Sequence, residues 1–115
     1  MHVWVTGAGG FVGRHLVTHL RDAGCRVSTS DRDVDVTERG AVAEAVTRMA
    51  PDAVIHLAAQ SSVAASLQDP AGTFRVNYLG TWALLEAVAE RAPKARVLVV
   101  GSGDQYASAP PGSPP

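Results

Sequence analysis

Several residue types are scarce in this 115-residue sequence, and each scarcity excludes a class of protein. Cys25 is the only cysteine, so no disulfide can form within the chain. The 10 lysine and arginine residues face 11 aspartate and glutamate residues, which leaves no basic surplus to hold a nucleic-acid backbone. No apolar run approaches the roughly 18 residues of a membrane span, and the N-terminus does not resemble a signal peptide. We therefore expect a cytoplasmic protein that binds neither nucleic acid nor membranes.

Glycine, by contrast, is concentrated at the start of the chain, within residues 6–13. An apolar strand at residues 3–5 leads into this segment, and a helix with apolar residues at helical spacing follows it. Gly7 permits a sharp exit from the strand, Gly10 leaves room for a pyrophosphate, and Gly13 lets the helix lie close to the sheet. The helix N-terminus adds free N–H groups and a positive dipole end. This order predicts a dinucleotide site, and a glycine turn without a ligand is the alternative.

An acidic residue follows the second expected strand, residues 25–30. Asp31 lies 18 positions after Gly13 (31 − 13), where a carboxylate can accept hydrogen bonds from the adenosine ribose and repel the extra phosphate of NADP. Asp31 therefore favours NAD as the cofactor. Two alternatives stay open, because Asp31 could cap a turn and Arg32 could bind the 2′-phosphate of NADP.

The remaining sequence alternates expected strands and helices. We expect strands at residues 33–36, 53–59 and 97–100, the last two buried, and a helix capped by Thr37 with Val42, Ala45, Val46 and Met49 on one face. A long helix after Asp69-Pro70 is expected to place five side chains on the sheet: Phe74, Tyr78, Trp82, Leu85 and Val88. This alternation is typical of a doubly wound parallel sheet.

Three further features have mainly structural interpretations. Cys25 is expected to be a small packing residue. His15 and His19 lie four positions apart on one helix but lack other ligands at metal-binding spacing, so we expect a solvated face and no metal site. His56 lies in an apolar strand and is expected to be buried with a hydrogen bond.

Five motifs taken together resemble the extended short-chain dehydrogenases, the sugar-nucleotide epimerase and dehydratase family. They are Thr6-Gly7-x-x-Gly10-Phe11-Val12-Gly13, Asp31, His56-Leu57-Ala58-Ala59-Gln60, Asn77-x-x-Gly80-Thr81 with Leu84-Leu85-Glu86-Ala87, and Gly101-Ser102-Gly103-Asp104-Gln105-Tyr106. Residues 60–66 and 102–104 look most like GDP-mannose 4,6-dehydratases and the related GDP-4-keto-6-deoxymannose reductases. The resemblance implies a three-layer α/β Rossmann-type domain over residues 1–108, incomplete with about five strands, and a Pro-rich tail at 109–115.

The resemblance also implies roles for individual residues. The expected cofactor contacts are Gly7, Gly10, Phe11 and Val12 at the pyrophosphate, Asp31 and Arg32 at the ribose, Asp35 and Val36 at the adenine, and Leu57, Ala58, Ala59 and Ser61 along the cofactor. Asn77 matches an asparagine that braces the central strands. Ser102 matches the catalytic Ser or Thr, and Asp104 matches an acid/base carboxylate of the dehydratases. The implied reaction is NAD-dependent hydride transfer at C4 of a nucleotide sugar through a 4-keto intermediate.

One family motif is missing from the sequence. The family's Tyr-x-x-x-Lys pair, in which the lysine lowers the tyrosine pKa for proton exchange with the sugar, has no counterpart, because the tyrosines are Tyr78 and Tyr106 and the only lysine is Lys94. We therefore expect an N-terminal portion of such an enzyme that is inactive alone, with a catalytically incomplete dinucleotide-binding module as the alternative. The last strand is then expected to have an exposed edge, which favours a homo-oligomer or a complementing C-terminal segment.

Overall fold

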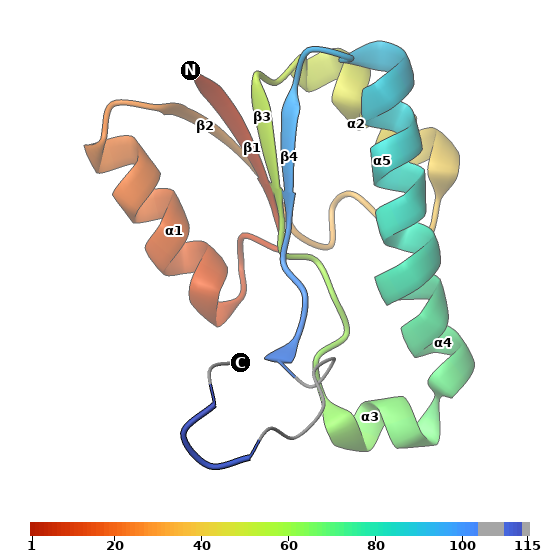
Figure 1. Cartoon of the computed structure of the whole chain (residues 1–115). Coiled ribbons are helices and arrows are strands. Elements are labelled where there is room, and N and C mark those ends of the chain that lie inside the picture. The colour runs from red at the N-terminus through yellow and green to blue at the C-terminus, as the bar shows by residue number, and fades with distance from the viewer. Residues whose placement is uncertain (104–109, 114–115) are drawn as a thin grey trace.

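The computed structural model describes residues 1–103 and 110–113 and contains a parallel sheet between two layers of helices (Figure 1). The strands are β1 (His2–Thr6), β2 (Arg26–Ser30), β3 (Ala53–His56) and β4 (Arg96–Val99). The helices are α1 (Phe11–Asp22), α2 (Arg39–Met49), α3 (Val63–Gln68), α4 (Pro70–Phe74) and α5 (Gly80–Arg91), with the π-helical segment η1 (Arg75–Leu79) joining α4 to α5.

The strand order β2-β1-β3-β4 explains where a ligand can bind. The chain first moves outward from β1 to β2, then returns to the other side of β1 to form β3 and β4, and all pairings are parallel. In Figure 1, α1 covers one face of the sheet, and α2 and α5 cover the other. This is the predicted doubly wound α/β arrangement, and its switch point lies between the carboxyl ends of β1 and β3.

The core is divided by the sheet because side chains of a strand alternate between its faces. Trp4 lies in a cluster with α2 and α5, and its indole N–H donates to Ser30 Oγ at 2.9 Å. Val3 and Val5 point the other way and pack against Val17 of α1. Cys25 packs at the border of that second cluster, which confirms its predicted structural role.

The predicted strand at residues 33–36 is wrong. This segment forms bends and turns, because the Asp35 carboxylate accepts hydrogen bonds from the Thr37 backbone N–H at 2.9 Å and hydroxyl at 2.7 Å, which holds a turn. Val34 is buried in the core without a strand partner. The alternation of aspartate and valine in this segment therefore indicates which residue is buried and not a strand. Thr37 does not cap the helix either, because α2 begins after Glu38.

Two strands differ from their predicted extent or burial. The strand expected at residues 53–59 ends at His56, because the Leu57 N–H is shared between the carbonyl and the hydroxyl of Thr6, both at 3.2 Å, and the Ala58 N–H bonds to Thr6 Oγ1 at 3.2 Å. The last strand, expected to be buried, is largely exposed, with Leu98 57% accessible. β4 pairs only with β3 among the described residues, so the expected exposed edge is confirmed.

The long helix after Asp69 turns the opposite face to the sheet. Four of the five side chains predicted to face inward are exposed, and only Val88 is buried. The buried face consists instead of Gly80, Ala83, Leu84, Ala87 and Val88, three of which are glycine or alanine. A Cβ at Gly80 would lie 2.9 Å from Val36 Cγ2, so close packing at this end of α5 leaves no room for aromatic rings.

The predicted inner face of α2 is confirmed, since Val42, Ala45 and Val46 are buried and Met49 packs beside them. Among the described residues, none of the helices combines the length and the apolarity needed to cross a bilayer.

Candidate functional site

The candidate site lies where the glycine turn meets the carboxyl end of β3. Gly7 has φ +66°, and a Cβ there would lie 2.7 Å from the Ala58 backbone nitrogen. A Cβ at Gly13 would lie 2.7 Å from Ala8 Cα. Side chains are therefore excluded at both positions, as the sequence pattern predicts, and backbone alone forms the wall of the turn. At Gly13 the close neighbour is the turn itself and not the sheet.

The N-terminus of α1 is open for an anion. Gly10 precedes the helix without a side-chain cap, and no acidic residue lies in the first turn. Among the described residues, the N–H groups of Phe11, Val12 and Gly13 have no acceptor. The Phe11 and Val12 side chains are 82% and 59% exposed. Three free N–H groups at the positive end of a helix suit a phosphate.

Asp31 reaches the glycine turn from the end of β2. A Cβ at Gly9 would collide with the Asp31 carboxylate, so the two residues are in close contact. They share an open hollow of about 460 Å³ with Ala8 and Asp33 of the turns, with Thr29 and Ser30 at the end of β2, and with Arg14, Val17, Thr18 and Arg21 of α1. The Asp31 backbone N–H donates to Asp33 Oδ1 at 2.6 Å, and Arg14 Nε donates to Gly9 O at 2.9 Å. A carboxylate therefore lies beside the glycine turn that leads into α1, as ribose recognition requires.

The other residues predicted to contact the adenosine, Arg32, Asp35 and Val36, do not line this hollow. Arg32 is exposed and does not line this hollow, whereas Asp33 does. The hydrogen bond from the Thr37 side chain, followed by that from its backbone, lowers the pKa of the exposed Asp35 carboxyl. Val36 is half-buried against Gly80 of α5. Asp35 and Val36 thus stabilise the turn before α2 in this structure.

A buried hydrogen-bonded network fixes the ends of β1 and β3 behind the turn. Thr6 Oγ1 accepts the two N–H groups after β3, so its own hydrogen is directed to His56 Nδ1, 2.7 Å away. His56 Nε2 then donates to Thr81 Oγ1 at 3.1 Å, and Thr81 donates to the Asn77 carbonyl at 2.7 Å. Desolvation by burial lowers the pKa of His56, which keeps the ring neutral. The predicted buried histidine is confirmed.

Asn77 connects the π-helical segment to the loop after β3. Its side chain accepts the Gln60 N–H at 2.7 Å and donates to the Gln60 carbonyl at 3.0 Å. A side-chain amide that pairs with both backbone groups of one residue holds the loop of Leu57, Ala58, Ala59 and Ser61 in a fixed position beside the glycine turn. The bracing predicted for Asn77 thus acts on this loop.

Of the two predicted catalytic residues, Ser102 follows β4, at the carboxyl edge of the sheet. Ser102 is exposed there. Asp104 lies outside the described residues, as does Tyr106. Because β3 and β4 are parallel neighbours, Ser102 follows the strand next to the one that leads to Ala58.

Of the residues that line the hollow, only Asp31 was predicted as a site residue, and the sequence analysis missed the other nine, among them Gly9, Arg14 and Asp33. The glycine-rich spacing itself signals Gly9, since Asp31 must pass close to the turn. Asp33 was hidden by the mistaken strand assignment, and Arg14 has no pattern that distinguishes it from other exposed helix residues.

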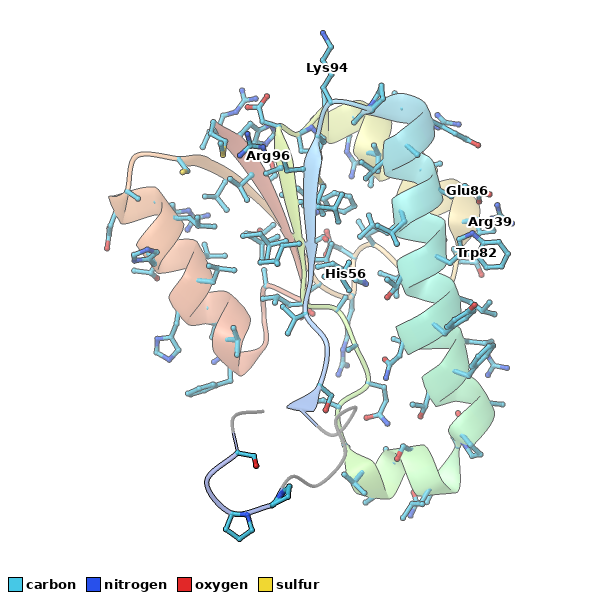
Figure 2. All side chains as sticks on the ribbon, in the orientation of Figure 1. Arg39, His56, Trp82, Glu86, Lys94 and Arg96 are labelled. Atoms are coloured by element: carbon cyan, nitrogen blue, oxygen red, sulfur yellow. The ribbon has the colours of Figure 1, made fainter. Side chains whose placement is uncertain are left out.

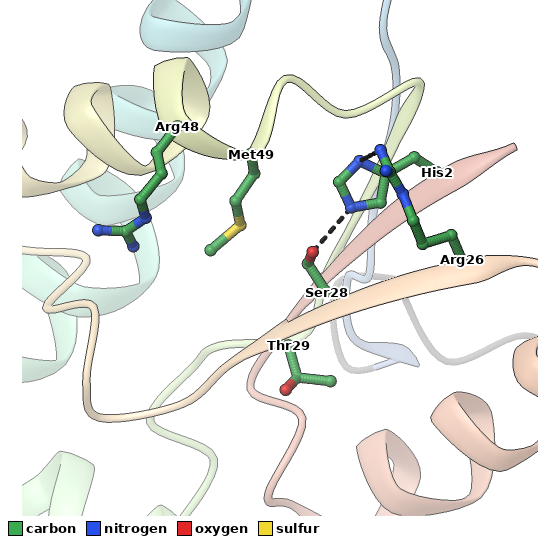
Figure 3. Close-up of a pocket in the computed structure, with 6 residues that line it drawn as sticks. All are labelled: His2, Arg26, Ser28, Thr29, Arg48 and Met49. Atoms are coloured by element: carbon green, nitrogen blue, oxygen red, sulfur yellow. Dashed lines mark hydrogen bonds between the residues drawn. The ribbon is translucent and has the colours of Figure 1, made fainter.

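A second hollow, of about 470 Å³, lies at the amino ends of the strands (Figure 3). Arg26 donates to His2 Nδ1 at 2.9 Å, so the hydrogen of the neutral ring lies on Nε2 and is donated to Ser28 Oγ at 2.7 Å. None of the predicted site residues lines it. His15 and His19 are exposed on α1, and no group of metal-ligating side chains occurs among residues 1–103 and 110–113.

Comparison with known proteins gives a consistent result. The sequence model of the NAD dependent epimerase/dehydratase family matches residues 3–115. A GDP-6-deoxy-D-mannose reductase of Pseudomonas aeruginosa is 38% identical over 106 residues, which cover 90% of this chain and 34% of that protein. The solved structure of MoeE5 in complex with UDP-glucose and NAD has a TM-score of 0.82 at 33% identity, over 95% of this chain and 39% of that one.

A dTDP-4-dehydrorhamnose reductase from Bacillus anthracis, solved with NADP, shares the fold with a TM-score of 0.77 at 24% identity, over 84% of this chain and 34% of that one. The chain thus spans about a third of the length of the proteins it matches. Structures of this fold hold either NAD or NADP.

Proposed function

The chain belongs to the NAD-dependent epimerase/dehydratase family, and we propose that it binds NAD as the cofactor-binding portion of a cytoplasmic enzyme that acts on a nucleotide sugar. The observation that carries this proposal is the contact between the Asp31 carboxylate and Gly9, beside the three free N–H groups of α1. A carboxylate and an anion site at this spacing match the ribose and the pyrophosphate of a dinucleotide.

The preference for NAD over NADP rests on charge. A 2′-phosphate would approach Asp31 and Asp33, both of which line the hollow, and the repulsion between like charges disfavours it. Arg32, the residue that would favour NADP, does not line the hollow. Arg14 and Arg21 do line it, and Arg14 is held by the Gly9 carbonyl.

The proposed reaction is hydride transfer at C4 of the sugar through a 4-keto intermediate. NAD, when bound, supplies the hydride acceptor. In this proposal Gly7, Gly10, Phe11 and Val12 surround the pyrophosphate, the free N–H groups of Phe11 and Val12 donate to it, and the loop of residues 57–61 lines the cofactor. Ser102 would hydrogen-bond a sugar oxygen, and Asp104 would exchange a proton where the chemistry includes elimination.

Calorimetric titration of the chain with NAD and with NADP tests the binding proposal. We expect NAD to bind more tightly, and Asp31→Ser to weaken NAD binding about tenfold or more, because charge-assisted hydrogen bonds to the ribose are lost. Asp22→Ser, at the far end of α1, is the matched control and should leave binding unchanged. Absence of heat with both cofactors contradicts dinucleotide binding, and tighter binding of NADP contradicts the assignment of NAD.

A second candidate is a dinucleotide-binding module without catalysis, and the lack of a Tyr-x-x-x-Lys pair in the sequence favours it for this chain alone. The two candidates share the binding test and differ in turnover. Because a reaction through a 4-keto intermediate returns the hydride and leaves no net NADH, the readout with NAD and UDP-glucose as the probe is conversion of the sugar, and this second candidate predicts none. Turnover by the isolated chain contradicts it.

A further inference from the structure

The loop after β3 is held at two points, and both connect to the buried ring of His56. In the proposed function residues 57–61 line the cofactor, and we call them the cofactor loop. At the start of the cofactor loop, Thr6 Oγ1 accepts the N–H groups of Leu57 and Ala58, each at 3.2 Å. The same oxygen lies 2.7 Å from His56 Nδ1. Thr6 therefore joins the ring to the first two amides of the loop.

The second point lies near the end of the cofactor loop, where the Asn77 side chain pairs with both backbone groups of Gln60 at 2.7 and 3.0 Å. Thr81 donates to the Asn77 carbonyl at 2.7 Å and accepts from His56 Nε2 at 3.1 Å. Figure 2 shows His56 between the sheet and the helix α5. One imidazole ring thus lies between the two anchors of the loop.

The hydrogen bonds around Thr6 Oγ1 are complete only while His56 is neutral. A hydroxyl group donates one hydrogen and accepts through two lone pairs. Both lone pairs are occupied by the amides of Leu57 and Ala58, so the hydrogen is left for His56 Nδ1. The neutral ring with its hydrogen on Nε2 satisfies every partner at once.

A proton on His56 Nδ1 would break this arrangement. The ring would then donate at Nδ1, and the Thr6 hydrogen would have to turn toward one of the two amide hydrogens that the oxygen now accepts. Turning toward Leu57 costs least, because that N–H keeps the Thr6 carbonyl at 3.2 Å. Either choice removes a hydrogen bond that fixes the start of the cofactor loop. The bond from Nε2 to Thr81 is the same in both states, so it does not compensate.

No charged side chain faces the ring in the part of the chain that the structure describes. His56 is 3% exposed, its partners are the hydroxyls of Thr6 in β1 and Thr81 in α5, and its neighbour in β4 is Val99. Burial is the cause that lowers the pKa of the ring. The charged side chains labelled in Figure 2 lie on the far side of α5 or at the amino ends of the strands, namely Arg39, Glu86, Lys94 and Arg96.

We propose that His56 is a positioning residue of the cofactor site: its neutral ring lets Thr6 hold the cofactor loop in place, so NAD binding weakens when the ring takes up a proton. This inference rests on the proposed function. NAD affinity should be constant above the folded-state pKa of His56, which lies below 6.5, and should fall below it by at most about tenfold per pH unit. Because linkage is reciprocal, bound NAD should lower that pKa further.

Calorimetric titration with NAD from about pH 8 to about pH 5 tests the proposal, with circular dichroism to verify that the chain is folded at each pH. We expect the affinity of the wild type to fall about fivefold or more at the acid end. His56→Asn places an amide oxygen where Nδ1 accepts but cannot titrate, so its affinity should stay constant with pH. His15→Asn is the matched control, because His15 is an exposed histidine beside Phe11 at the start of α1, and this variant should keep the fall.

The possible results separate this inference from the proposed function. A folded wild type that binds NAD equally at every pH overturns the inference and leaves the proposed function intact. A fall in His56→Asn that equals the fall in the wild type also overturns it. Absence of NAD binding at every pH contradicts both.

A second measurement needs neither NAD nor a variant. Nitrogen chemical shifts of the His56 ring and amide shifts of the labelled chain are followed against pH. We expect the neutral ring to carry its hydrogen on Nε2, and the amides of Leu57 and Ala58 to titrate with the same midpoint as the ring, while the amide of Ala89 in α5 does not follow it. Loop amides that do not follow the ring overturn the proposal, and so does a neutral ring with its hydrogen on Nδ1.

Discussion

The β1–α1–β2 unit and the helix of residues 70–91 are determined by different kinds of interaction. In the first, the left-handed conformation of Gly7 and the close contact of Gly13 with Ala8 define the turn. In the second, the orientation of the helix depends on partners distant in sequence, such as Val36 against Gly80. Local residue types therefore suffice to predict the first region, whereas the second also requires knowledge of tertiary packing.

The largest effect within the β1–α1–β2 unit is expected from Gly7→Ala, which tests the first side of this comparison. The left-handed conformation costs about 1–2 kcal/mol for a residue with a Cβ, and the overlap with Ala58 adds about 1–3 kcal/mol. Gly24→Ala is the control, since Gly24 has φ +84° but no atom within 4 Å of a new Cβ. Urea unfolding should show a loss of about 3 kcal/mol for Gly7→Ala and about 1 kcal/mol for Gly24→Ala. Equal losses would contradict the role given to the Ala58 contact.

The next effect concerns the network that joins the two regions. Thr6→Val should lower the free energy of unfolding by about 2 kcal/mol, because His56 Nδ1 and the Ala58 N–H lose their partner, while the Leu57 N–H keeps only the Thr6 carbonyl. Thr18→Val, whose exposed hydroxyl donates only to the Arg14 carbonyl, should change it by less than about 0.5 kcal/mol. A Thr6→Val protein as stable as the wild type would mean that the network does not stabilise the strand ends.

Acidification should weaken the same network through His56. Its folded-state pKa lies below the ordinary value of 6.5, so the unfolded chain binds the proton more readily. The contribution of His56 to the free energy of unfolding is constant above pH 6.5, the ordinary pKa. It falls as the pH drops below that value, by at most about 1.4 kcal/mol per pH unit. Chemical unfolding at several pH values should show a steeper loss in the wild type than in His56→Gln. Identical slopes would exclude His56 as the titrating group.

The smallest effect is expected at the exposed edge. Leu98→Ala should change stability by less than about 0.5 kcal/mol, although the sequence predicts a buried strand there. Leu84→Ala, at 1% exposure, should cost about 2–5 kcal/mol. Thermal or urea unfolding of the two variants compares the exposed surface of β4 with the buried face of α5. A large loss for Leu98→Ala would show that residue to be covered in solution.

The sequence was sufficient for the doubly wound order, the glycine turn and the placement of Asp31, because each depends on residue types at fixed local spacing. It was misleading for Phe74, Tyr78 and Trp82, since hydrophobicity favours large side chains for the buried face while close helix packing selects Gly80 and Ala83.

The strand predicted at residues 33–36 failed for a related reason. The Asp35 carboxylate forms a turn with Thr37, and this short-range bond outweighs the alternation of valines. Asp33 consequently lies in the hollow beside Asp31, a position that a strand assignment cannot anticipate.

The central claim is that the glycine turn and Asp31 together hold a dinucleotide. Amide chemical shifts of the isotope-labelled chain during titration with NAD test it most directly, because they report position as well as binding. The account predicts the largest shifts at Gly7, Gly9, Gly10, Val12 and Asp31, with little change at Ala89 of α5 or in the hollow around Arg26. Saturable shifts around Arg26 with an unchanged glycine turn would contradict it.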